Sequence, residues 1–135
     1  MTTTSIYAYP LTLILFVAID MVWLLGPGRP FYVAEIGGMM RTNPNLPAAL
    51  AFYLIYALGL VFFVISGAVA GAAAQQALWQ GALLGLVAYG TYDLTNLAVI
   101  NGFTLKIALI DLVWGSVLSG VVSWLATKLM LVFGA

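Results

Sequence analysis

The sequence predicts an all-α fold, an integral membrane four-helix bundle that forms a single transmembrane domain over residues 1–135. The chain is 64% hydrophobic, and only 6% of its residues are charged, whereas a soluble domain carries about a quarter charged residues. Its apolar runs reach about 20 residues, the length of helix that crosses roughly 30 Å of hydrocarbon. The period-two alternation of membrane β-strands is absent, which leaves helices as the spanning elements.

We expect four membrane spans, at about residues 6–25, 47–70, 78–100 and 105–132. The first ends at the breaker cluster Gly26-Pro27-Gly28-Arg29-Pro30. Asn45 can cap the second helix, with Pro47 in its first turn, where a missing N–H costs little. Asn101-Gly102 predicts a tight turn between the third and fourth spans.

The only long connection joins the first two spans, and it admits two interpretations. Residues 31–40 are largely apolar, with Glu35 and Arg41 nearby. This composition favours an amphipathic segment that lies at the membrane interface. Gly37-Gly38 equally favours an irregular loop.

The basic residues indicate how the chain is oriented. Arg29, Arg41 and Lys106 fall on one side of the predicted spans, and Lys128 falls on the other. The positive-inside rule makes the first side cytoplasmic. The first apolar run lacks the positive region of a signal peptide, so we expect it to be retained. These features predict a multi-pass protein of the cell inner membrane with both termini outside.

Composition excludes several kinds of chemistry. The chain contains no His and no Cys, so histidine or cysteine metal sites, haem–His ligation and thiolate nucleophiles are ruled out. We therefore expect no metal site and no cofactor. The four basic residues are scattered, and nucleic-acid binding needs a basic patch. The expected partner is membrane lipid, and no nucleic acid.

Three aspartates lie inside apolar stretches: Asp20, Asp93 and Asp111. A carboxylate at mid-bilayer costs about 2.5 kcal/mol or more on insertion scales, so each aspartate is expected to have a structural or functional role that offsets this cost. The segment Asp20-Met21-Val22-Trp23 resembles Asp111-Leu112-Val113-Trp114. The two segments lie in spans of opposite direction, which places both aspartates near the cytoplasmic side. Inverted repeats build binding sites in this way in many transporters.

Helical spacing groups further polar residues. In the third span, four of them share one face at i, i+3, i+4 and i+7, namely Tyr89, Tyr92, Asp93 and Asn96. Gly81 and Gly85 continue that face as a small-xxx-small pair, which lets another helix approach closely. In the fourth span, Asp111, Gly115 and Ser119 share a stripe.

The polar and aromatic residues of all four spans agree in depth, so we expect one ligand-binding or proton-handling site. Its candidate residues are Asp20, Trp23, Tyr53, Tyr56, Tyr89, Tyr92, Asp93, Asn96, Asp111 and Trp114. Asp93 is the strongest candidate, because it lies roughly 10 Å inside its helix end at 1.5 Å per residue. No catalytic residue is assigned.

Structural roles compete with this site. Trp23, Tyr53 and Trp114 are also typical of interfacial belt or packing residues. Asp20 and Asp111 lie close enough to helix ends to form ion pairs with one of the basic residues on that side, which are Arg29, Arg41 and Lys106.

Four motifs in order along the chain carry a family resemblance: Asp20-Met-Val-Trp23, Phe52-Tyr-Leu-Ile-Tyr56, Tyr89-Gly-Thr-Tyr-Asp-Leu-Thr-Asn96 and Asp111-Leu-Val-Trp-Gly115. With these motifs the chain resembles an uncharacterised bacterial family of small four-helix membrane proteins, the domain of unknown function 2177 (DUF2177). The resemblance implies the four-span layout and a lipid context. It implies no established activity.

The residues leave three functions open. The first is a proton- or cation-linked transporter or channel subunit that uses Asp93 with Asp20 or Asp111, in which a homo-oligomer would complete the pathway. The second is a non-catalytic lipid-binding or assembly protein of the membrane. The third, a lipid-modifying enzyme, is the least favoured, because the sequence shows no nucleophile–base pair or metal-ligand set.

Overall fold

The computed structural model describes residues 3–133, which fold into helices joined by short turns. The elements are α1 (Thr3–Leu25), α2 (Arg29–Ile36), η1 (Gly37–Met39), α3 (Leu46–Leu60), η2 (Val61–Ile65), α4 (Ser66–Ala70), α5 (Ala74–Val99) and α6 (Leu105–Phe133). The all-α class expected from the sequence is therefore confirmed.

Three segments within the described residues are long and apolar enough to cross a membrane: Thr4–Leu25, Leu46–Ala70 and Leu105–Phe133. This is one fewer than the four spans expected from the sequence. Helix α5 is 26 residues long, but its polar side chains lower its hydropathy. They include Gln75, Gln76, Gln80, Asp93 and Asn96.

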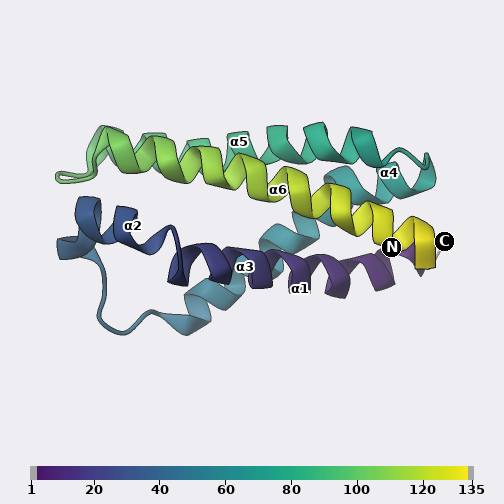
Figure 1. Cartoon of the computed structure of the whole chain (residues 1–135), viewed down its shortest axis with the longest axis horizontal. Helices are drawn as coiled ribbons and strands as arrows, with labels where there is room; N and C mark the ends of the chain where they lie inside the picture. The colour runs from purple at the N-terminus through teal and green to yellow at the C-terminus, as the bar shows by residue number, and fades with distance from the viewer. Residues whose placement is uncertain (1–2, 134–135) are drawn as a thin grey trace.

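The long helices lie side by side, with both chain ends at one end of the molecule (Figure 1). The opposite end carries α2, η1 and the turn between α5 and α6, and we call it the α2 end. Helix α5 packs along α6, and α1 packs on both α3 and α6. Residues near the C-terminus of α1, the C-terminus of α5 and the N-terminus of α6 are thereby brought to the same end.

The segments α3, η2 and α4 follow one another without a break and form the second apolar segment. The Asn45 side chain accepts a hydrogen bond from the Ala48 N–H at 3.1 Å, which confirms the predicted cap. Val61–Ile65 forms a π-helical turn, a feature that often marks a functional or strained point in a helix. Val61 and Ile65 are buried beside Phe16 in the main apolar core.

Small residues set the distance between α5 and α6. A Cβ atom on Gly81 would lie 2.5 Å from Ser123 Oγ, and one on Gly85 would lie 2.7 Å from Ser119 Oγ and closer still to the Gly115 carbonyl oxygen. A Cβ on Gly115 would collide with the Tyr89 ring. The Gly81–Gly85 pair therefore lets α6 approach α5 closely, as its spacing predicts. We call the contact between these two helices the α5–α6 seam.

Residues of the seam meet in an antiparallel register, one helical turn at a time. Gly81 faces Ser123, Gly85 faces Ser119, and Tyr89 faces Gly115. One turn further toward the α2 end, the same register brings Asp93 to Asp111. Close packing of glycines thus forces two carboxyl groups together.

The connection after α1 is mostly helical, so the amphipathic-segment interpretation describes its secondary structure better than an irregular loop does. Helix α2 begins at Arg29 with Pro30 in its first turn, a position where proline is pre-organised for a helix. Glu35 accepts a hydrogen bond from the Thr104 hydroxyl at 2.7 Å, which ties α2 to the start of α6. Gly102 has a φ of +87°, as a tight turn at this point requires.

Candidate functional site

Asp20 joins three helices at the α2 end. Its carboxylate accepts hydrogen bonds from the Tyr53 hydroxyl of α3 at 2.7 Å and from the Trp114 indole N–H of α6 at 3.0 Å. Tyr53 and Trp114 are both neutral donors. They take the place of the ion pair with Arg or Lys that the sequence also allowed for Asp20. The buried carboxylate of Asp20 is therefore satisfied by the bundle itself.

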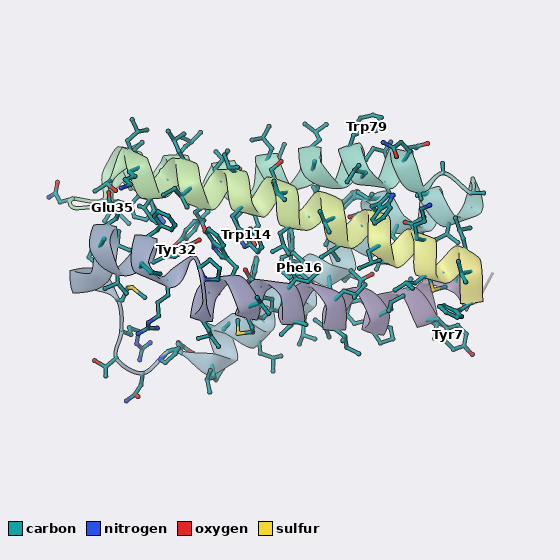
Figure 2. All side chains as sticks on the ribbon, in the orientation of Figure 1. Tyr7, Phe16, Tyr32, Glu35, Trp79 and Trp114 are labelled. Carbon is teal, nitrogen blue, oxygen red and sulfur yellow. The ribbon has the colours of Figure 1, made fainter. Side chains whose placement is uncertain are left out.

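Asp111 is held by a residue of α2. Tyr32 donates from its hydroxyl to Asp111 Oδ1 at 2.7 Å and accepts from the Trp23 indole N–H at 3.0 Å. Burial raises the pKa of the Tyr32 phenol above its ordinary value of 10.0, and the nearby Asp111 carboxylate raises it further. Tyr32 is consequently neutral and acts as a donor. Figure 2 labels Tyr32 and Trp114 in the half of the molecule that carries α2.

The two similar segments of the sequence cross-bond each other. The Trp114 side chain, from the segment of Asp111, donates to Asp20. The Trp23 side chain, from the segment of Asp20, reaches Asp111 through Tyr32. The two indoles stack with ring centroids 4.7 Å apart and an interplanar angle of 16°. Trp114 thus donates directly to the aspartate of the other segment, whereas Trp23 is linked to Asp111 only through the Tyr32 hydroxyl.

Asp93 has a different environment. Its side chain is 0% exposed, and neither carboxyl oxygen accepts a hydrogen bond from any donor within residues 3–133. The group that it faces is the carboxyl of Asp111, across the α5–α6 seam. A hydrogen bond between two carboxyl groups requires a proton on one of them. The Asp93–Asp111 pair is therefore suited to sharing a proton.

A cavity of about 420 Å³ opens between four helices at the α2 end. Its walls are mostly aromatic and aliphatic, and two carboxylates stand among them. The lining residues are Asp20, Leu24, Phe52, Tyr53, Ala88, Tyr89, Tyr92 and Asp111. They come from α1, α3, α5 and α6, so every long helix contributes to the wall. Cavities of this size and character commonly bind small molecules.

The structure brings together most of the residues that the sequence predicts for one site. Asp20, Tyr53, Tyr89, Tyr92 and Asp111 line the cavity. The remaining residues lie around it: Trp23 and Trp114 in the stack, Asp93 in the seam, Tyr56 bonded to Ser119 at 2.7 Å, and Asn96 one turn from Tyr92.

Four residues of the site were not predicted. Tyr32 lies in the connection after α1, and only the docking of α2 brings it to Asp111. Leu24, Phe52 and Ala88 line the cavity but carry no polar side-chain atom, so no chemical signal marks them in the sequence.

Tyr32 should make the docking of α2 sensitive to alkaline pH. A released phenol ionises near its ordinary pKa of 10.0, whereas the docked one resists ionisation. Docking is then fully stabilised below pH 10 and weakens above it, by up to about 1.4 kcal/mol per pH unit. Fluorescence of Trp23 and Trp114, with the other two tryptophans replaced by Phe, should report this release. A Tyr32→Phe variant should lack the transition, and docking that persists unchanged above pH 11 in the parent would contradict it.

The fold defines the class: this is an all-helical protein with three apolar helices long enough to cross a membrane among the described residues. Residues 5–128 match the family described as predicted membrane protein, DUF2177. The match covers most of the chain, and the protein belongs to this family. Comparison with curated proteins and with solved structures gives no match.

Proposed function

We propose that the chain crosses the inner membrane four times as a four-helix bundle, with α5 as the fourth span. Helix α5 has 26 residues and is about 39 Å long at 1.5 Å per residue, enough to span the hydrocarbon. Asp93, its only charged residue, is buried against α6 and so adds no charge to a lipid-facing surface. The exposed bases Arg29, Arg41 and Lys106 at the α2 end favour a cytoplasmic location for that end, with both termini outside.

Cysteine labelling can test this orientation. Gln75 and Arg41 are both exposed, at opposite ends of the long helices. We expect an impermeant thiol reagent added outside intact cells to label Gln75→Cys and to leave Arg41→Cys unlabelled until the membrane is opened. The chain has no native cysteine, so the background is low. The reverse pattern would overturn the orientation.

The function that the geometry supports best is binding of a membrane amphiphile. The observation that carries it is the cavity of about 420 Å³, with aromatic walls and the carboxylates of Asp20 and Asp111. Its apolar walls suit an alkyl chain, and its carboxylates suit a polar head. Phe52 and Tyr92 are partly exposed at the surface of α3 and α5, which allows entry from the lipid side.

Filling the cavity should abolish this binding. Ala88 lines the cavity, so an Ala88→Phe variant would place a ring where the amphiphile lies. We expect at least a tenfold loss of lipid that copurifies with the protein, measured by mass spectrometry of extracts at equal protein amounts. Ala98, on the same helix and exposed, provides the matched control Ala98→Phe. Equal lipid content in the two variants would count against the binding function.

A second candidate, proton-linked transport, has its own supporting observation. Beyond the Asp93–Asp111 pair, α6 carries three fully buried hydroxyl residues on the same stripe, Ser119, Ser123 and Thr127. Ser123 Oγ has no hydrogen-bond partner within the described residues. These groups extend the polar seam away from the α2 end. Proton flux into liposomes that Asp93→Asn abolishes would support transport over binding alone, and a homo-oligomer would provide a wider path.

A further inference from the structure

We propose that the amphiphile bound in this cavity is an organic cation whose ammonium group lies between Asp20 and Asp111. This inference rests on the proposed binding function and names its ligand class. Both carboxylates line the same cavity. A ligand between them therefore meets negative charge on two sides.

No basic residue of the chain neutralises this charge. All four Lys and Arg residues are exposed on the surface, and none lines the cavity: Arg29, Arg41, Lys106 and Lys128. The hydrogen-bond donors to Asp20 and Asp111 are phenol and indole groups, which carry no charge. A cationic ligand would supply the positive charge that complements the site.

Asp93 provides an independent observation. It is 0% exposed, it lacks a donor within residues 3–133, and it faces Asp111. If one proton bridges this pair, the pair keeps one negative charge and Asp20 keeps another. Two negative charges then remain in an apolar bundle without a cation, which is a costly arrangement. An ammonium group beside Asp111 would offset that cost.

The cavity walls select an organic cation over a metal ion or an anionic head group. Phe52, Tyr53, Tyr89 and Tyr92 supply aromatic rings around the two carboxylates, and such rings attract alkylammonium groups. Among the described residues, no three acidic groups gather closely enough for a metal ion. A phosphate group would be repelled by both carboxylates.

Three amphiphiles with the same nitroxide-labelled alkyl chain can test the ligand class. Their heads are trimethylammonium, hydroxyl and phosphate, and each is added to the protein in micelles of a neutral detergent. Binding is read as quenching of Trp23 and Trp114 after Trp79 and Trp124 are replaced by Phe. The same titration of Ala88→Phe measures quenching by probe dissolved in the micelle, which is subtracted.

We expect the trimethylammonium probe to bind at least tenfold more tightly than the hydroxyl probe, and the phosphate probe to bind most weakly. An Asp111→Asn variant keeps an acceptor for Tyr32 and removes the carboxylate of α6 that lines the cavity. It should lower the affinity of the ammonium probe about tenfold and leave the hydroxyl probe unchanged. Asp20→Asn provides a second test if Asp111→Asn does not fold.

The outcomes separate this inference from the proposed function. Equal affinity for ammonium and hydroxyl probes, or the tightest binding by the phosphate probe, would overturn the cationic ligand and leave amphiphile binding intact. Quenching that is the same in the parent and in Ala88→Phe for every probe would overturn both. The comparison of the three head groups uses the parent protein, so it tests the ligand class even if neither Asn variant folds.

Discussion

Replacing Gly85 with Leu is expected to lower the free energy of unfolding by about 3 kcal/mol, at the upper end of overpacking costs. The new side chain would meet the Gly115 carbonyl oxygen and the Ser119 side chain of α6. A backbone atom cannot rotate away as a flexible side chain can, so α5 and α6 must move apart. Because the seam positions Asp93 against Asp111, the same substitution should also separate the carboxyl pair.

Gly67→Leu is the matched control for Gly85→Leu. Gly67 is also a helical glycine in a small-xxx-small pair, but a Cβ atom placed on it meets nothing within 4 Å. Its substitution should change stability by less than about 1 kcal/mol, since leucine also has the better helix propensity. The two variants can be compared by their unfolding midpoints in a mixed-micelle titration with SDS. Equal midpoints would show that the α5–α6 seam does not depend on close glycine contact.

The sequence predicts the parts of this fold that depend on local spacing. Apolar runs of span length indicate membrane helices, and the Gly81–Gly85 spacing predicts the close approach of a second helix. The face that carries Tyr89, Tyr92 and Asp93 follows from 3.6-residue periodicity. Composition alone does not determine the number of spans, because the polar residues of α5 lower its hydropathy.

The hydrogen-bond partners could not be read from the sequence, because they depend on how helices rotate against one another. Tyr32 lies 79 positions from Asp111, and Trp114 lies 94 positions from Asp20. No local pattern encodes such pairings. The repeated Asp-x-x-Trp segment indicated two equivalent contributions to one site. It did not indicate that Trp114 would donate to Asp20, or that Tyr32 would link Trp23 to Asp111.

Asp20 and Asp93 differ in how the bundle holds their carboxyl groups. Asp20 connects α1 with α3 and α6 through two donors. Asp93 bonds to no described donor, although it is the most buried of the three. Asp93 costs free energy to bury and has no described donor, which makes it a candidate for proton handling, whereas Asp20 joins three helices as well as lining the cavity.

Asparagine substitutions at the two positions should therefore have opposite effects. In Asp20→Asn, the amide keeps one acceptor oxygen and turns its NH₂ group toward a second donor, which leaves Tyr53 or Trp114 without a partner. Leaving one buried donor unsatisfied costs about 1–3 kcal/mol. In Asp93→Asn, the new NH₂ group can donate to the Asp111 carboxylate that it faces. The expected change in the free energy of unfolding there is between zero and a gain of about 1 kcal/mol.

The same SDS titration would measure both effects, and infrared spectroscopy adds a test that stability alone does not provide. If Asp93 and Asp111 share a proton, the parent protein should show the absorption of a protonated carboxyl group at neutral pH, and Asp93→Asn should lose it. Asp20→Asn should keep that absorption, because Asp20 is bonded to Tyr53 and Trp114 and takes no part in the pair. A loss of stability in Asp93→Asn as large as that in Asp20→Asn would mean that Asp93 has a stabilising role in the bundle. Asp93 would then share the structural role of Asp20 in the bundle, and the proton-sharing pair would have to be abandoned.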